Sequence, residues 1–468
     1  MKQIVILFLL TTLLFATSCK KDRLYSGSDE VLKFSADTLT FDTVFTSVGS
    51  ITRYFKVENT LKETVKLDKI ELMGLPGTQF RINVDGEPGR IIENLEIPAK
   101  DYIYIFAEVT VDPNNQNNPF VLLDEIEYHY NGVVQKSYLR AWGQNAYFHY
   151  GEVITGDSVW NNDKPHVVVR NDSFPGVGIE SFGSLQIKAG CKVYFTAGSG
   201  IFSDGPLTIG EPNCMDSVVL QSDRIEDLPN GLIYDDKKGL WLGIVLRNGA
   251  TGTFHNTIIN NATYGILGRW IFDDFSTFSQ SNQPQLVLDK VKIKNTSNTA
   301  LFCLNANVEC NNSIFYSAGN GLATLAMGGN YNFTNCTFYG TGEQAAVALS
   351  NYASNGTQGG YGNLTAANFT NSIIDGSKND EFSINNDAIA DFNFDLKNCL
   401  VRTSLNTDTS TYTNCIFNQN PQFKNTQEGN FHLKDNSPCI ATGTNSTYLY
   451  DYYCNIHNNP FDIGAILY

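Results

Sequence analysis

The stretch Phe333-Thr334-Asn335-Cys336-Thr337-Phe338 carries the pattern that decides the fold of most of the chain. An apolar residue is followed by a spacer, an Asn, a small Cys, Ser or Thr, another spacer and a second apolar residue. Looser copies lie at 254–259, 312–315, 369–374, 396–401 and 412–417. Each copy is too short to bury its own apolar residues, so the copies must stack on one another. The repeats therefore predict a solenoid.

The Asn of this element indicates what kind of solenoid forms. Asn tolerates a left-handed backbone, which suits a sharp corner between two short strands. Stacked Asn side chains can also hydrogen-bond from one coil to the next. We therefore predict a parallel β-helix in which one corner is formed by a column of Asn side chains, namely Asn335, Asn371, Asn398 and Asn414.

Residues 147–468 resemble the right-handed parallel β-helix, pectin-lyase-like superfamily. The coils Gly190–Phe195, Gly205–Gly210 and Gly239–Ile244 match its opening and middle, and Phe431–Leu433, Ser437–Ile440 and Asp462–Ala465 match its closing coil. The resemblance implies the fold but not one function, because this fold serves lyases, hydrolases, adhesins and passive stalks. Its enzymes act on acidic polysaccharides along a groove on one face.

Residues 24–145 predict a separate β-sandwich. Alternating runs recur through this segment, and Asn131-Gly132 between the last two runs is a strong hairpin signal. Short strands over about 120 residues suit an immunoglobulin-like sandwich. Val48–Ser50 and Phe55–Thr60 resemble immunoglobulin-like modules of the ASH and major-sperm-protein kind, which implies a spacer or protein-contact domain. The expected fold class is thus all-β, a sandwich followed by a right-handed parallel β-helix.

The first residues predict export and lipid anchoring. Lys2 precedes a short apolar run that ends in Ala16-Thr17-Ser18-Cys19. A basic start, an apolar core too short to span a bilayer and small residues before the cut are typical of a signal peptide. The Cys after small residues resembles a bacterial lipobox, so we expect a leader at 1–18, a lipidated Cys19 and a linker at 19–23. We expect the protein to be a lipoprotein of the bacterial cell envelope, anchored in the outer membrane and facing the periplasm or the surface.

Composition excludes one class of partner. The net charge is −16 and only 17% of residues are charged, so binding to nucleic acid by bulk electrostatics is not expected. The negative net charge also argues against polyuronates as ligands or substrates. Scattered His residues and the lack of Cys-x-x-Cys pairs predict no metal site. An oxidising compartment permits disulfides, and we expect Cys439 to pair with Cys454, whereas Cys191 and Cys214 are either bridged or merely stacked.

Two groups of residues are candidates for function. Asp387, Asp391 and Asp395 precede Arg402 by about one coil, and such carboxylates could hold calcium beside a base. Solvated surface is the alternative for these acidic residues. Trp270, Phe272, Tyr352 and Tyr361 lie in insertions where rings could stack on sugars, and simple packing is the alternative there. Tyr452 and Tyr453 are expected to help cap the open solenoid end.

The function expected from these patterns is glycan or partner binding at the cell envelope, without catalysis and without a cofactor. Incomplete hydrolase motifs and the negative charge favour neutral or weakly charged glycans. A polysaccharide lyase or glycoside hydrolase acting on a surface polysaccharide is the first alternative, with calcium only in the case of the lyase. A structural or adhesive stalk is the second. The partners expected are a membrane, through the N-terminal lipid, and a polysaccharide or surface protein.

Overall fold

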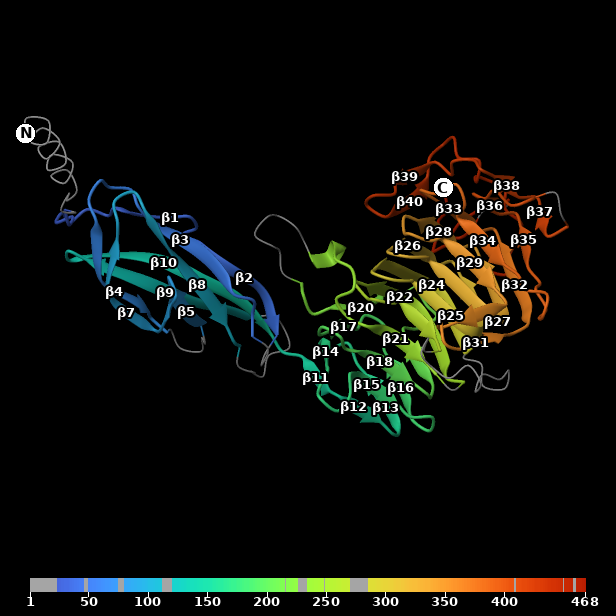
Figure 1. Ribbon diagram of the computed structural model, residues 1–468, viewed down its shortest axis with the longest axis horizontal. Coiled ribbons are helices and arrows are strands. Elements are labelled where there is room, and N and C mark those ends of the chain that lie inside the picture. Colours follow the sequence, from blue (N-terminus) through green and yellow to red (C-terminus); the bar gives the residue numbers. More distant parts are fainter. Residues whose placement is uncertain are drawn as a thin grey trace, which may run out of the picture. The chain divides into compact units, whose positions relative to one another are not determined.

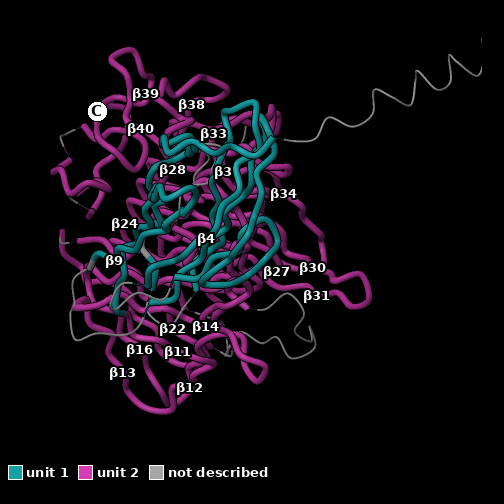
Figure 2. The backbone as a smooth tube through the Cα atoms, turned by 90° about the vertical axis from the view of Figure 1, so that its left-hand side faces the viewer, with its two compact units in different colours: residues 1–145 teal, residues 146–468 magenta. Residues whose placement is uncertain are grey.

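The computed structural model divides the chain into two compact units, residues 1–145 and 146–468 (Figures 1 and 2). It describes residues 23–45, 49–74, 80–111, 120–214, 216–225, 234–247, 249–269, 285–407, 410–448, 450–457 and 460–468. The leader and Cys19, on which the export prediction rests, lie outside the described residues. Each unit is described by itself below.

The first unit is a sandwich of two five-stranded sheets. One sheet has the order β1-β3-β8-β5-β6, with strands Leu32–Phe34, Arg53–Asn59, Tyr102–Val109, Phe80–Val84 and Glu87–Pro88. The other has the order β2-β10-β9-β4-β7, with strands Thr38–Phe45, Val133–Gln144, Phe120–Tyr130, Val65–Leu72 and Ile91–Ile97. All pairs are antiparallel except β2 with β10.

Alternation along these strands builds the sandwich core. In β8 the residues Ile103, Ile105, Ala107 and Val109 are buried and the residues between them are not, as a strand with one solvated face requires. Asn131 and Gly132 join β9 to β10 with φ angles of 46° and 78°, which is the two-residue turn predicted from their sequence. The predicted sandwich is thereby confirmed.

The second unit is a parallel solenoid. Among the described residues, β11 to β38 without β30 and β31 form one continuous 26-stranded sheet. Early strands pair with the strand three places further along, so each coil contributes one strand to each of three faces. The parallel β-helix predicted from the repeats is confirmed, and the fold class of the chain is all-β.

The first face carries the site discussed below. It consists of β11 (Tyr147–Tyr150), β14 (His166–Val169), β17 (Lys192–Phe195), β20 (Val218–Ser222), the second halves of β22 (Thr251–Asn260) and β24 (Gln285–Thr296), β26 (Ile314–Ala318), β28 (Thr337–Gly340), β33 (Ile373–Gly376), β36 (Leu400–Val401) and β38 (Ile416–Phe417).

The other two faces complete each coil. The second consists of β12 (Glu152–Ile154), β15 (Gly176–Ile179), β18 (Gly200–Ser203), β21 (Gly243–Leu246), β23 (Ile266–Gly268), the first parts of β25 (Leu301–Asn311) and β27 (Ala323–Thr334), β29 (Val347–Ser350) and β34 (Phe382–Asn385). The third consists of β13 (Asp157–Trp160), β16 (Ser184–Ile187), β19 (Leu207–Ile209), the remaining parts of β22, β24, β25 and β27, β32 (Leu364–Thr370), β35 (Asp395–Lys397) and β37 (Tyr412–Thr413).

A column of Asn residues forms the corner between the third and first faces, as predicted. Asn335, Asn371, Asn398 and Asn414 have φ angles of 53°, 49°, 50° and 52°. Asn371 donates to the Oδ1 of Asn335 at 3.1 Å, and Asn335 donates to that of Asn312 at 3.1 Å. The side-chain ladder stops there, because the amide of Asn398 donates instead to the carbonyl of Thr442 at 2.9 Å.

The chain after the last coil turns back over the first face. A hairpin, β39 (Phe423–Asn425) and β40 (Asn430–Leu433), packs Phe423 and Phe431 against Tyr339 and Tyr316. Residues 442–457 without 449, called the strap below, then follow the Asn corner. Thr444 exchanges two hydrogen bonds with Asn371, of 2.7 and 2.8 Å, and the Tyr448 hydroxyl donates to Glu309 at 2.9 Å.

The strap ends in a disulfide that differs from the predicted one. Cys454 pairs with Cys214, 240 residues earlier, while Cys439 is a buried free thiol. The prediction of a Cys439–Cys454 bridge was wrong because it used proximity in sequence. Cys439 packs among apolar residues of the first face such as Ile373 and Leu400, whereas the strap takes Cys454 back along several coils.

Candidate functional site

A groove lies between the outer side of the first face and the returning C-terminal chain. It encloses about 580 Å³ and is lined on the solenoid side by Val219, Gln221, Asp235, Ile258, Asn260, Lys292, Lys294 and Tyr316, and on the C-terminal side by Glu428, Gly429, Asn430, His432 and Tyr453. A second hollow of about 280 Å³ shares Asp235, Lys294, Tyr316 and Glu428 with it. The two form a continuous, mostly polar site.

Lys292 is out of place in its column of the first face. Successive coils put Val219, Ile258, Lys292, Ile314, Thr337, Ile373 and Leu400 in register, all on the outer side. Beyond Lys292 the returning chain covers this column, so that Ile314, Ile373 and Leu400 are fully buried among Phe431, Leu433 and Ile463. The cover leaves a groove over Val219, Ile258 and Lys292, and Lys292 is the charged one of these three. The column also begins with a lysine, the exposed Lys192 in register with Val219.

Two tyrosine rings hold the ammonium of Lys292. Its Nζ lies 4.6 Å from the ring centre of Tyr452 and 5.8 Å from that of Tyr453, which are cation–π distances. No carboxylate among the described residues forms an ion pair with it. Burial, with a smaller contribution from neighbouring Lys294, lowers the pKa of Lys292 to about 8. A partly desolvated cation without a counter-ion is costly unless something binds it.

The remaining walls supply rings, amides and one ion pair. The His432 ring stacks on Tyr453 at 5.2 Å, and burial lowers the pKa of His432. Lys294 pairs with Asp235 at 2.8 Å, which neutralises the second lysine of the groove. Burial also raises the pKa of Tyr316 to about 12, so its hydroxyl stays protonated. Among its described residues, the groove therefore offers one cation without an ion-pair partner and several hydrogen-bonding groups.

Gly429 sets how closely the hairpin approaches the solenoid. It adopts a φ of 68°, and a Cβ placed there would collide with the hydroxyl of Tyr316. Any other residue would have to push the hairpin tip outward in addition to adopting a left-handed backbone. The width of the groove at this point therefore depends on a glycine.

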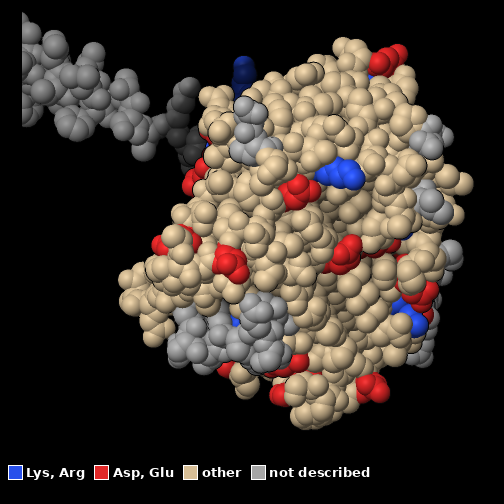
Figure 3. All heavy atoms as spheres, turned by 90° about the vertical axis from the view of Figure 1, so that its right-hand side faces the viewer, with Lys and Arg blue, Asp and Glu red and all other residues tan. Residues whose placement is uncertain are grey.

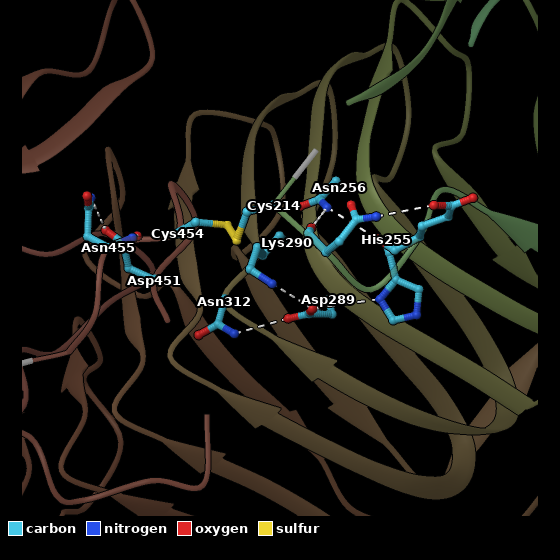
Figure 4. Close-up of a disulfide and its surroundings, with 11 residues drawn as sticks. Cys214, His255, Asn256, Asp289, Lys290, Asn312, Asp451, Cys454 and Asn455 are labelled. Carbon is cyan, nitrogen blue, oxygen red and sulfur yellow. Dashed lines mark hydrogen bonds and ion pairs between the residues drawn. A yellow bond between two sulfur atoms is a disulfide. The ribbon is translucent and has the colours of Figure 1, made fainter. Parts of the chain in front are cut away.

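A cluster of charged and amide side chains lies at the corner beside the disulfide (Figure 4). Lys290, with a φ of 55°, takes the corner place that Asn has in other coils. Asp289 pairs with Lys290 at 2.9 Å, faces His255 at 3.7 Å and accepts from Asn312 at 3.1 Å. Burial acts to raise the pKa of Asp289, but hydrogen bonds from His255 and Lys290 hold it below its usual value. The cluster extends the Asn ladder by one coil, because Asn312 donates to Asp289.

The predicted catalytic group is not brought together. Arg402 forms an ion pair with Asp375, and neither Asp387, Asp391 nor Asp395 is its partner. Asp387 lies beside Asn351, which donates to its backbone carbonyl at 2.7 Å. Asp391 borders β32, where its amide donates to the side chain of Asn363 at 3.0 Å, and Asp395 is exposed at the start of β35. These residues build turns and a strand end.

Two of the predicted glycan-binding rings do form a pair. Tyr352 and Tyr361 face each other across the hairpin of β30 (Tyr352–Ser354) and β31 (Gly359–Tyr361), with ring centres 4.9 Å apart. The hairpin follows β29 of the second face, so this pair belongs to another surface than the groove. Tyr361 remains 42% exposed, as a ring that binds a ligand must. Trp270 and Phe272 lie outside the described residues.

Sequence reasoning missed the groove residues. Val291–Lys294 alternates apolar and basic residues, which indicates only a strand with a solvated outer face. The contrast between Lys292 and its apolar neighbours Ile258 and Ile314 exists between coils whose paired residues are 34 and 22 residues apart in the chain. Tyr452 and Tyr453 were expected at the solenoid end, but they lie over Lys292 because the strap runs back along the corner.

The chain was compared with protein families and with curated proteins. No family model matches it, and no curated protein matches it. Within the described part of the chain, no group of three or more His, Cys, Asp or Glu side chains could hold a metal ion. In the same residues no helix is long and apolar enough to cross a membrane. The face shown in Figure 3 carries only scattered charged side chains.

Proposed function

We propose that the protein binds glycans in the groove of the first face and does not cleave them. The observation that carries the proposal is Lys292, an unpaired cation under two rings on the floor of a cavity of about 580 Å³. Rings, amides and a cation are the groups that recognise sugar faces, hydroxyls and acidic or polar substituents. The dispersed carboxylates Asp387, Asp391 and Asp395 support the absence of catalysis.

The wider setting belongs to the same proposal. We propose that Cys19 is acylated and holds the protein in the bacterial cell envelope, with the sandwich as a spacer and the β-helix as the binding unit. The resemblance to the pectin-lyase-like superfamily supports a glycan as the ligand. The groove also contains Glu428 and Asp235, of which Asp235 pairs with Lys294, so the cation at Lys292 modifies the expectation from net charge only close to its own ammonium group.

A glycan array with the full-length chain tests the proposal, using neutral and acidic polysaccharides side by side. Binding to a glycan should weaken at least about tenfold in Lys292→Met, which removes the cation and keeps the length of the side chain. Lys62→Met is the matched control, because Lys62 is exposed on the sandwich. The double variant Tyr352→Ala/Tyr361→Ala tests the other surface: a loss there, with Lys292→Met unaffected, would move the site to the β30–β31 hairpin.

The enzymatic alternative is decided by product release. Each glycan that binds is incubated with the protein and calcium, and new reducing ends or unsaturated products are measured. Product that disappears in Asp391→Asn would establish the lyase or hydrolase and overturn the proposal. Binding that is unchanged in Asp391→Asn, without product, supports it.

A further inference from the structure

The outer wall of the groove depends on how the strap is fastened. At one end Thr442 and Thr444 bind Asn398 and Asn371 of the corner. At the other end the Cys214–Cys454 disulfide joins it to the loop before β20. Tyr452 and Tyr453, which cover Lys292, lie directly before Cys454. The strap is thus attached to the solenoid by hydrogen bonds at one end and by a covalent bond at the other.

The turn that carries Cys454 is held mainly by its own end of the chain. Buried Asp451 accepts from the amides of Asn455 at 2.7 Å and Leu467 at 3.1 Å, and Tyr452 donates to Ala465 at 2.8 Å. These contacts tie the turn to the last residues of the chain, where Ala465 donates to Thr337 of β28 at 3.0 Å. The disulfide is the covalent attachment of the turn to the solenoid. Cys454 itself has a φ of 66°, a conformation that a non-glycine residue adopts only where its surroundings impose it.

The solenoid side of the disulfide is firmly seated. The side chain of Asn256, at the corner, donates to the carbonyls of Asn213 and Glu211, which lie one and three residues before Cys214 (Figure 4). The coil therefore holds Cys214 in place. Cys454 lies in the segment that could move if the bond were cleaved. Cleavage of the bond would leave Cys214 in place and remove the covalent attachment of this end of the strap.

We propose that the Cys214–Cys454 disulfide is a redox-sensitive latch that keeps Tyr452 and Tyr453 over Lys292, so that reduction opens the groove and weakens ligand binding. The effect on binding rests on the function proposed above; the opening does not. A dithiol reductant attacks one sulfur, both protein sulfurs leave as thiols, and the reductant becomes its own disulfide. No further reactant is needed.

The opening is tested without a ligand, on the full-length chain. Acetic anhydride labels amines, and mass spectrometry follows the rate at Lys292 before and after dithiothreitol, and in Cys214→Ser/Cys454→Ser. We expect labelling of Lys292 to become about tenfold faster in both cases. Lys62 should not change. Hydrogen exchange in residues 285–334 should also stay the same, which shows that the coils remain folded. Cys415→Ser, which removes a partly exposed free thiol, should behave like the wild type.

Equal labelling of Lys292 in the oxidised and reduced protein, with the disulfide shown to be cleaved, would overturn the latch. Faster labelling with unchanged affinity for a bound glycan would overturn its control of binding. A protein that binds no glycan but opens on reduction would refute the proposed function and leave the latch supported. The two proposals therefore fail separately.

Discussion

Lys292 in β24 is in register with Ile314 in β26, one coil further along the same face. Ile314 is fully buried beneath the returning chain, whereas Lys292 lies at the point where that chain leaves a groove. A β-helix presents the same position many times, and at Lys292 a charged residue stands between the apolar Ile258 and Ile314 of the neighbouring coils. The difference is confined to this part of the face, and it marks where the solenoid is open to a ligand.

Lys292→Met should stabilise the protein at neutral pH. The folded-state pKa of about 8 lies below the value of about 10.4 of an unfolded lysine, so the unfolded chain binds more protons between these values. Stability of the wild type therefore rises with pH through this window. We expect Lys292→Met to gain about 1–3 kcal/mol at pH 7 and the gain to shrink towards pH 10. Urea unfolding at both pH values measures it, and a loss of stability at pH 7 would contradict the burial of an unpaired cation.

The Asn corner should be sensitive to both backbone and side chain. Asn398→Leu should cost about 1–3 kcal/mol, because it leaves the carbonyl of Thr442 unpaired and forces Leu to a φ of 50°. Asn398→Gly keeps the backbone freedom and loses only the amide, so it should cost less. Thermal unfolding of the two variants separates the contributions. Equal costs for Leu and Gly would show that the left-handed backbone carries no penalty there.

The first coils should weaken in acid. His166 stacks on Trp160 at 4.6 Å and contacts Nε2 of His149 at 3.0 Å, and burial lowers its pKa to about 4. Unfolded histidine titrates near 6.5, so the stability present above that pH is lost as pH falls towards 4. His166→Phe keeps the ring and removes the proton. Hydrogen exchange of residues 147–195 at pH 7 and 4.5 should show a smaller acid effect in this variant. Glu152, which pairs with His149, and Asp163 are the carboxylates that act against this lowering of the pKa of His166.

Cys19→Ala should release the protein from the membrane fraction. Cys19 follows small residues at the end of an apolar leader, and acyl chains on it are the proposed anchor. Fractionation with and without detergent, followed by immunoblotting, measures the distribution. A variant that stays with the membrane until detergent is added would refute the lipobox interpretation.

The features that follow from short-range pattern were predictable. The hairpin at Asn131-Gly132 and the left-handed corner at Asn335 and Asn371 depend on the residues themselves and their immediate neighbours. A repeated six-residue element is enough to indicate stacking, because no single copy can bury its apolar residues alone. The two-part all-β architecture followed from such patterns.

The pairing of Cys454 with Cys214 and the groove around Lys292 were decided only by the tertiary structure. Both depend on residues from distant coils and on the path of the last segment, which folds back over the first face. Sequence proximity favoured Cys439 for the disulfide, but Cys439 is a buried free thiol. It also favoured Arg402 as the base beside the carboxylates, but Arg402 forms an ion pair with Asp375. The sequence by itself determined the repeating coil, since that is a matter of local conformation and burial. The tertiary structure decided which segment covers the coils and where it leaves the groove. Both depend on the register between coils and on the path of the C-terminal segment back over the first face.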